Sequence, residues 1–246
     1  MSKIVYHNMK LKNLNSLKIN SVCKYYINIQ SEFDLDTVAV QKKFKNLDTF
    51  VLGGGTNTFF HKNFAGLVIK MSLTGIQIVQ ELNNLVYIKA GAGENWHKVV
   101  TYAVKKGFGG IENLALIPGT VGGGLVGNIG AYGREISDSV YEVITFNLKT
   151  GKKAFFNNSE CGFGYRTSLF KSKYKHLVVM LIIFRLNKKI KLEISYKSRN
   201  ESLKSTALSL AKGKKLKIED VYKAVVMIRR NKLPGSSLIP NVRILE

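Results

Sequence analysis

The chain has 246 residues, of which 38 are basic and 16 acidic, so its formal net charge at neutral pH is +22. Hydrophobic residues make up 45% of it, enough for the core of one large domain or two small ones. The two cysteines, Cys23 and Cys161, form no Cys-X-X-Cys motif, which argues against a disulfide scaffold and favours a reduced, cytosolic protein. The four histidines lack metal-ligand spacing, so we expect no metal site.

The sequence gives no indication of export or membrane insertion. The N-terminus is polar and has no apolar segment typical of a signal peptide. The longest apolar run, Leu177 to Phe184, is too short to cross a bilayer and predicts a strand buried on both faces. We therefore expect a cytoplasmic protein with no membrane partner. The sequence leaves the oligomeric state open, and a monomer is the favoured expectation.

The excess of positive charge has two interpretations. One is a basic module that binds nucleic acid. The lysines are spread along the whole chain, however, and the abundance of Lys, Asn, Ile, Phe and Tyr is typical of an AT-rich coding sequence. We therefore expect no nucleic-acid partner, whereas a positive surface favours small anionic substrates such as nucleotide diphosphates.

The hydrophobic pattern alternates between strands and helices. It predicts a short helix at residues 34–46, followed by strands at Phe50–Leu52 and Leu67–Met71. A hairpin at 76–88, which turns at Asn83-Asn84, and a helix at 96–104, which ends before Gly107, come next. Further on it predicts a second hairpin, a buried strand and a helix, at Val140–Phe156, 177–186 and 218–230. The polar stretch Asn187 to Lys217 predicts a domain junction.

Two glycine-rich segments are the most informative part of the chain. Residues 118–133 contain seven glycines among apolar residues, and Gly53-Gly54-Gly55-Thr56-Asn57 follows a short apolar run. Glycine permits positive φ angles and lets the backbone lie close to a bound group. Two such segments indicate a large, extended cofactor; the alternative is two tight turns in a β-rich domain.

Five segments form an ordered series of motifs between about residues 12 and 234, at Val51–Asn57, Gly91–Trp96, Glu112–Gly119, Asn128–Gly133 and Cys161–Lys171. In this order and spacing they resemble the UDP-N-acetylenolpyruvoylglucosamine reductase (MurB) family of peptidoglycan precursor synthesis. The resemblance implies an α+β, two-subdomain FAD-binding fold of the PCMH/MurB type. It implies FAD-binding subdomains at 1–72 and 73–187, and a junction with a remnant of the substrate domain at 188–246.

The resemblance also implies FAD as cofactor and NADPH as hydride donor. By carry-over, backbone amides of the first loop hold the FAD pyrophosphate, and the second segment lies along the isoalloxazine and ribityl groups. The implied cofactor-binding residues are Gly53, Gly54, Gly55, Thr56, Asn57, Pro118, Gly119, Val121, Gly122, Gly123, Asn128, Gly130 and Ala131.

The same resemblance assigns residues to the substrate, an enolpyruvyl UDP-sugar. Arg166 matches the family arginine that holds the substrate carboxylate and stabilises negative charge in the reaction, which makes it the implied catalytic residue. Tyr132, Tyr196 and Lys232 match positions that contact the UDP-sugar, although the sequence around the last two matches less well.

Departures from the family pattern affect these expectations. Gly123, Gly124 and Gly127 replace residues with side chains, so we expect weaker retention of FAD. After Pro234 the family's proton-donating serine lacks a clear counterpart, and Asn241 stands where the family has a catalytic glutamate. Neither Ser236 nor Ser237 is assigned as the proton donor. A slow reductase and a flavin-binding protein without turnover therefore both remain open.

Overall fold

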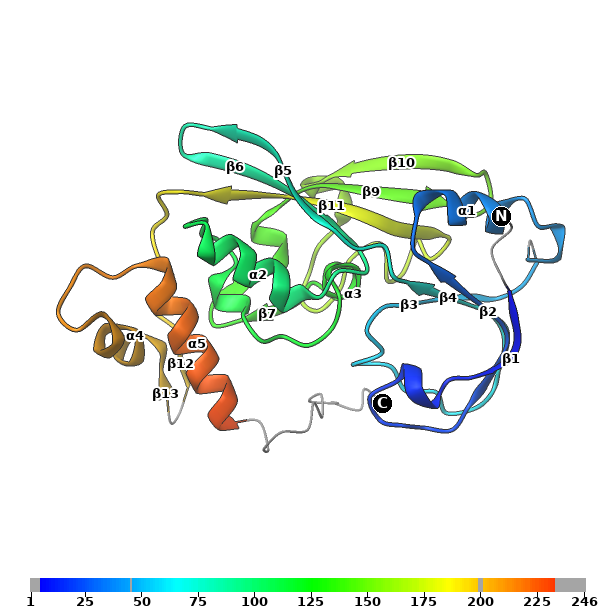
Figure 1. Ribbon diagram of the computed structural model, residues 1–246, viewed down its shortest axis with the longest axis horizontal. Helices are drawn as coiled ribbons and strands as arrows, with labels where there is room; N and C mark the ends of the chain where they lie inside the picture. The colour runs from blue at the N-terminus through cyan, green and yellow to red at the C-terminus, as the bar shows by residue number, and fades with distance from the viewer. Residues whose placement is uncertain (1–4, 45, 199–200, 233–246) are drawn as a thin grey trace.

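The computed structural model describes residues 5–44, 46–198 and 201–232. Figure 1 shows a four-stranded sheet at one end, two helices near the C-terminal end of the described chain at the other, and a five-stranded sheet between them. Two further helices, α2 (Trp96–Lys105) and α3 (Val121–Val126), lie beneath the five-stranded sheet.

The four-stranded sheet has the order β1-β2-β4-β3, with strands at Tyr6–Lys10, Val22–Ile29, Phe64–Met71 and Thr49–Leu52 respectively. β1 is antiparallel to β2, whereas β2, β4 and β3 run parallel. β4 buries both faces, which explains its continuous apolar sequence. Because Leu52 pairs with Lys70, the loop after β3 begins beside the end of β4.

The five-stranded sheet is antiparallel and has the order β10-β9-β11-β6-β5. Its strands lie at Lys152–Asn157, Val140–Asn147, Leu177–Asn187, Leu85–Gly91 and Ile76–Leu82 respectively. Trp96 of α2 is fully buried, with its ring centroid 5.8 Å from that of Phe184 on β11. Its indole Nε1 donates a hydrogen bond of 2.8 Å to the Leu114 carbonyl, so one side chain joins the sheet, α2 and the following loop.

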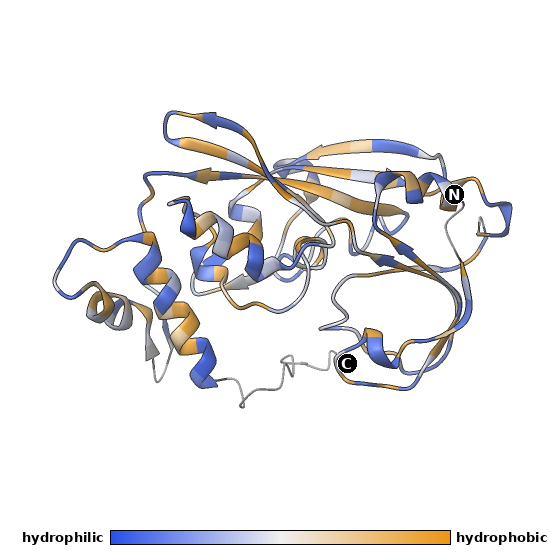
Figure 2. Ribbon diagram, in the orientation of Figure 1, coloured by the Kyte–Doolittle hydropathy of each residue, from blue (hydrophilic) through white to orange (hydrophobic). Residues whose placement is uncertain are grey.

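Helices α4 (Leu203–Ala211) and α5 (Ile218–Lys232) pack against each other, and α5 also contacts α2. Figure 2 shows α5 in alternating orange and blue, because Val221, Ala224, Val225 and Ile228 are buried while most of its charged residues are exposed. The remaining elements are α1 (Glu32–Ala39), short strands at Gly130–Ala131 (β7), Arg134–Glu135 (β8), Lys197–Ser198 (β12) and Glu201–Ser202 (β13), and 3₁₀ turns at Lys12–Leu14, Lys42–Phe44, Glu112–Leu114, Ile136–Asp138 and Asn158–Cys161.

Most of the predicted elements are confirmed: both hairpins, the helix at 96–104, the strand at 177–186, which is central in its sheet, and the helix at 218–230. The helix expected at 34–46 is wrong in extent, since α1 begins after Ser31 and ends at Ala39. Its start is fixed by Asp34, whose carboxylate accepts from the Ser31 N–H at 2.9 Å. The polar stretch expected to hold a junction contains α4, and the predicted domain boundaries stay predictions.

The long glycine segment differs from expectation in one respect. Gly122, Gly123 and Gly124 lie inside helix α3 and adopt no positive φ; in residues 118–133 only Gly119 (φ 116°) and Gly133 (φ 80°) among the glycines do so. A Cβ at Gly122 would lie 2.9 Å from the Ala92 Cβ, and one at Gly124 would lie 2.8 Å from Ile129 Cδ1. These glycines therefore permit close packing of α3 rather than an unusual backbone.

In the described part of the chain, no helix is both long and apolar enough to span a bilayer. The same residues include no group of three or more His, Cys, Asp and Glu side chains arranged to hold a metal ion.

Cys161 is fully buried, and its thiol donates to the Asn157 carbonyl at 3.3 Å. Burial, with a smaller effect of Glu160, raises the pKa of Cys161 to about 12. At pH 8 its thiolate fraction is then on the order of a thousandfold below that of a free cysteine. We expect Cys161 to resist Ellman's reagent in the native protein and to react after unfolding. Rapid labelling of Cys161 in the folded protein, located by mass spectrometry, would contradict this.

Candidate cofactor and substrate site

The two glycine segments meet in space. A Cβ at Gly53 would lie 2.6 Å from Thr120 Oγ1, and a Cβ at Gly54 would lie 3.0 Å from Gly119 Cα. In the other direction, a Cβ at Gly119 would lie 3.0 Å from Thr56 Oγ1. The loop that follows the first sheet therefore touches the loop that leads into α3, with no room for side chains at the contact.

The first loop is fixed from both sides. It starts at the carboxyl ends of parallel strands, the edge at which ligands bind in open sheets. Gly55 has a φ of 66°, and a Cβ there would overlap the carbonyl oxygen of Leu14. The Gly55 carbonyl accepts from the Ser16 N–H at 3.0 Å. The glycine is thus required both by conformation and by contact with the 3₁₀ turn before it.

The second loop is anchored to the five-stranded sheet. The N–H groups of Val121 and Gly122 donate to the carbonyls of Glu94 (2.9 Å) and Ala92 (2.8 Å). The Glu94 side chain is buried, and burial alone would disfavour its charge. Hydrogen bonds from the Gly75 N–H, the Lys98 ammonium and the Asn95 N–H nevertheless hold the pKa of Glu94 below its usual value. A charged carboxylate therefore supports the backbone on which the loop rests.

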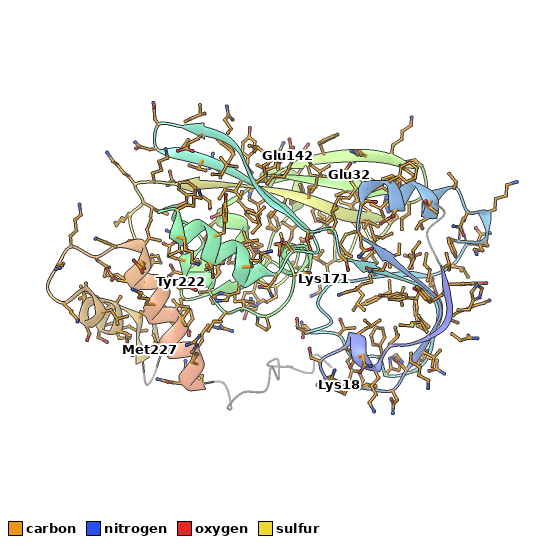
Figure 3. The ribbon with its side chains drawn as sticks, viewed as in Figure 1. Lys18, Glu32, Glu142, Lys171, Tyr222 and Met227 are labelled. Atoms are coloured by element: carbon orange, nitrogen blue, oxygen red, sulfur yellow. The ribbon has the colours of Figure 1, made fainter. Side chains whose placement is uncertain are left out.

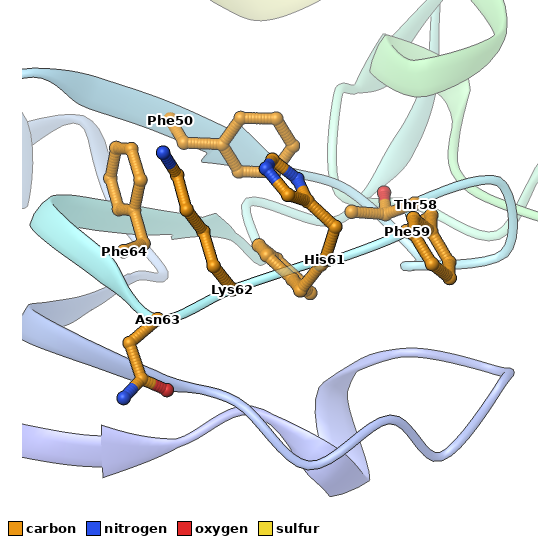
Figure 4. Close-up of a pocket in the computed structure, with 8 residues that line it drawn as sticks. Phe50, Thr58, Phe59, His61, Lys62, Asn63 and Phe64 are labelled. Carbon is orange, nitrogen blue, oxygen red and sulfur yellow. The ribbon is translucent and has the colours of Figure 1, made fainter. Parts of the chain in front are cut away.

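These loops fit an extended dinucleotide. Their glycines leave backbone N–H groups unshielded by side chains, which suits an anionic phosphate. The close contacts at Gly53, Gly54 and Gly119 are made with the opposite loop and bring the two sets of amides together. The residues expected to bind the cofactor at Gly53–Asn57 and Pro118–Gly123 are brought together. A separate hollow of about 200 Å³, shown in Figure 4, lies next to the first loop between Phe50, Phe59 and Phe64 and is lined by none of the predicted site residues.

Asn128 is buried and already saturated by the protein. Its amide donates to the Glu135 carboxylate at 2.8 Å and to the Gly164 carbonyl at 3.0 Å, and its oxygen accepts from the Ser137 N–H at 3.3 Å. Asn128 therefore ties the motif at residues 128–133 to the loop that contains Arg166, and its side chain has no donor left for a ligand.

The Arg166 side chain reaches the same motif. Its Nη2 donates to the Gly130 carbonyl at 2.9 Å, while the residue as a whole is exposed and has a φ of 56°. The guanidinium carbon lies 5.8 Å from the centre of the Tyr165 ring. The hydrogen bond places a cation at Gly130, within the segment predicted to line the flavin.

Two of the predicted substrate residues contact each other. The rings of Tyr132 and Tyr196 lie 5.4 Å apart in an edge-to-face arrangement, and their exposed fractions are 8% and 41%. Asn113, which is fully buried, donates at 2.8 Å to the carbonyls of both Tyr132 and Glu193. This amide holds the segment before Tyr196 against the motif that carries Tyr132.

Helix α5 brings further cations to this region. Lys232 lies at its exposed end, and Arg229 is half-buried one turn earlier. Burial lowers the pKa of Arg229, with an opposing effect of nearby Tyr132, and its Nε is buried without a hydrogen-bond partner among the described residues. The sequence interpretation missed Arg229, and the charged residues in the last turn of α5 were the available signal.

The chain matches known families over most of its length. A family model described as FAD binding domain matches residues 23–152. Proteins named UDP-N-acetylenolpyruvoylglucosamine reductase from Amoebophilus asiaticus and Flavobacterium johnsoniae are 38% and 37% identical to it. These matches cover 95% and 96% of this chain, and 68% and 69% of the relatives.

This chain belongs to the UDP-N-acetylenolpyruvoylglucosamine reductase family. It spans about two thirds of the length of those relatives. It is a flavin-dependent oxidoreductase, and the predicted α+β FAD-binding fold of the MurB type is confirmed.

Solved structures agree on the fold. The crystal structure of the reductase (MurB) from Thermus caldophilus has a TM-score of 0.63 and 21% identity, with 96% of this chain and 72% of that one covered. The 6-hydroxy-D-nicotine oxidase of Arthrobacter nicotinovorans has a TM-score of 0.56 and 17% identity, with 76% and 42% covered. The fold of this chain thus recurs in an oxidase of low sequence identity, whereas the individual roles of the residues above stay predictions.

One histidine links α5 to the residues just before the second glycine segment. The His97 Nδ1 accepts from the N–H of Leu116, which has a strained φ of 56°. The His97 ring stacks on Tyr222 of α5, 5.9 Å between centroids, and Figure 3 shows Tyr222 where α5 faces α2. Burial, then Arg230 and Arg229, lower the pKa of His97. Neutral imidazole is therefore the form that the fold requires.

We expect this histidine to make the fold sensitive to acid. Because its folded-state pKa lies below the ordinary 6.5, its contribution is complete above pH 6.5 and is lost as the pH falls towards the folded-state pKa. In urea unfolding at pH 7.5 and 5.5, the wild type should lose more stability than His97→Asn, which keeps an acceptor but does not titrate. His61→Asn, at an exposed histidine, should behave as wild type. Equal pH dependence of all three proteins would show that His97 does not titrate in this way.

Proposed function

We propose that the chain catalyses the NADPH-dependent, FAD-mediated reduction of UDP-N-acetylglucosamine enolpyruvate to UDP-N-acetylmuramate, in peptidoglycan precursor synthesis in the cytoplasm. The observation that carries the proposal is the meeting of three features on one motif. The Gly130 carbonyl accepts a hydrogen bond from the Arg166 guanidinium, and the Tyr132 ring contacts the Tyr196 ring. The Asn113 amide binds the carbonyls of Tyr132 and Glu193 and so holds the segment before Tyr196 next to this motif. The reaction itself is proposed because the chain belongs to the reductase family.

Bound FAD supplies the transfer of hydride from NADPH to the enolpyruvyl double bond. The protein's contribution to cofactor binding lies in the two glycine loops. Neutral amides of Gly53–Asn57 suit an anionic pyrophosphate, and the absence of side chains at Gly54 and Gly119 lets the two loops lie against each other. Thr120, whose hydroxyl accepts from the Gly123 N–H at 3.4 Å, holds the start of α3 in place beside it.

Arg166 binds the substrate carboxylate in this proposal. A guanidinium has five N–H donors in a planar fork, and Arg166 uses one nitrogen for the Gly130 carbonyl. The other donors face solvent, since the residue is exposed, and suit a carboxylate held by two parallel hydrogen bonds. The same charge stabilises the negative charge that develops next to the carboxylate during hydride addition.

The UDP-sugar is held by the aromatic pair and by α5. Tyr132 and Tyr196 offer an apolar ring surface and hydroxyl groups, while Arg229 and Lys232 offer positive charge for a diphosphate. The possible proton donors Ser236 and Ser237, and the substituted position Asn241, lie outside the described residues. A flavin-binding protein without turnover is therefore the second candidate.

The two candidates differ in a single experiment on the purified 246-residue chain. We expect it to be yellow, to release its flavin on denaturation, and to lose the flavin absorbance when NADPH is added without oxygen. Addition of the enolpyruvyl substrate should restore the absorbance and yield UDP-N-acetylmuramate, detected by chromatography. Bleaching without any product would favour the second candidate, and a colourless chain that takes up no FAD would contradict both.

The role of Arg166 has its own test. Arg166→Lys keeps the charge but loses the planar fork, so kcat/KM for the enolpyruvyl substrate should fall about tenfold or more, as expected for a charged hydrogen bond worth about 1.5–3 kcal/mol. FAD affinity should be little changed. Arg185→Lys, at an exposed arginine of β11, serves as the matched control. Equal loss of FAD and substrate binding in Arg166→Lys would instead identify Arg166 as a structural residue.

A further inference from the structure

A lysine lies beside the first glycine loop. Lys70 is near the end of β4, paired in parallel register with Leu52, the residue that precedes Gly53. Its ammonium donates a hydrogen bond to the Gly53 carbonyl. The cation therefore lies at the carboxyl edge of the parallel strands, against the loop that meets Gly119 and Thr120.

This cation lacks a counter-charge. No described carboxylate lies within ion-pair distance of Lys70, and burial alone lowers its pKa. A half-buried ammonium with a single carbonyl partner is unfavourable in isolation, because it has lost water and has two donors to spare. Such a group is stabilised when an anion binds next to it.

Other positive groups in this region are differently placed. Arg166 is exposed and is bound to Gly130, in the second glycine segment. Lys98 is paired with the buried Glu94 carboxylate at 3.2 Å. Lys70 thus combines partial burial, the absence of an ion pair and direct contact with the first glycine loop.

We propose that Lys70 is a binding residue for the diphosphate of the dinucleotide cofactor, supplying the positive charge that the neutral amides of the Gly53–Asn57 loop lack. The proposal rests on the proposed function in that it takes FAD as the dinucleotide. The amides then donate directional hydrogen bonds to the same anion whose charge the Lys70 ammonium compensates. Bound diphosphate also removes the unfavourable state of the unpaired cation.

The test is FAD affinity of the flavin-free full chain, measured by quenching of flavin fluorescence at several salt concentrations. We expect Lys70→Met to weaken FAD binding about tenfold or more, and Lys70→Arg to keep it within about threefold, since arginine retains the charge. The affinity of wild type should also fall more steeply with salt than that of Lys70→Met. Lys24→Met, at an exposed lysine of the neighbouring strand β2, is the matched control and should bind as wild type.

Four results decide the outcome. Without FAD, Lys70→Met should melt at or above the wild-type temperature, because it removes a half-buried charge, so its loss of FAD binding cannot come from unfolding. Unchanged FAD affinity, or a salt dependence equal to that of wild type, would overturn the role of Lys70 while leaving the proposed function intact. In FAD-saturated protein, loss of UDP-N-acetylglucosamine binding in place of FAD binding would assign Lys70 to the substrate diphosphate and also overturn it. Wild type that binds no FAD at all would contradict the proposed function itself.

Discussion

The contact between the loops at Gly53–Gly54 and Gly119–Thr120 is the constraint on which the rest of the structure depends. The first loop follows β3 of the four-stranded sheet, and the second leads into α3, which is hydrogen-bonded to residues that follow β6 of the five-stranded sheet. The loops approach so closely that a Cβ at Gly53 would lie 2.6 Å from Thr120 Oγ1. Because both loops are anchored independently, through Leu14 and Ser16 on one side and through Ala92 and Glu94 on the other, their meeting fixes the relation of the two sheets at this point. An extended ligand that spans both loops is thereby offered a rigid surface.

The positions of a few cations distinguish this protein more than its total net charge does. The net charge of +22 is spread over the surface, where most lysines are solvated. Three cations differ: Lys70 lies at the first loop, Arg166 at Gly130 and Arg229 beside Tyr132. Of these, Lys70 and Arg229 are partly desolvated, which strengthens their interaction with an anion. In the proposed function, the positions of these cations, and not the total charge, provide for a dinucleotide and a UDP-sugar.

Sequence patterns predicted the elements whose apolar periodicity is strong. α2 carries a clear stripe, an Asn95 cap and Gly107 after its end, and β11 is a continuous apolar run, so both were predictable. α3 was not, because glycine is a poor helix former and three of its six residues are glycine. Packing against Ala92 and the cap by Thr120 outweigh this low propensity. β1 and β2 were missed because their polar residues conceal the alternation.

In the site, too, some features were predictable from the sequence and others were not. The motifs predicted roles for the residues at the two glycine loops, Arg166 and Tyr132, because these lie in distinctive local sequence, and the structure brings the two loops together. The contact of Tyr196 with Tyr132 depends on a buried amide, Asn113, 19 residues before Tyr132, and nothing in the local pattern announces it. For Lys70 a signal existed: it is the charged residue within the apolar strand Leu67–Met71, whose neighbours Ile69 and Met71 are buried.

The central claim, that the two loops form one binding surface for a dinucleotide, is tested most directly by hydrogen exchange of the backbone amides with and without FAD. We expect FAD to slow exchange in peptides covering residues 53–57 and in those covering 119–123, to a similar extent and at the same FAD concentration. Protection of one loop alone, or of neither while the protein binds flavin, would contradict it.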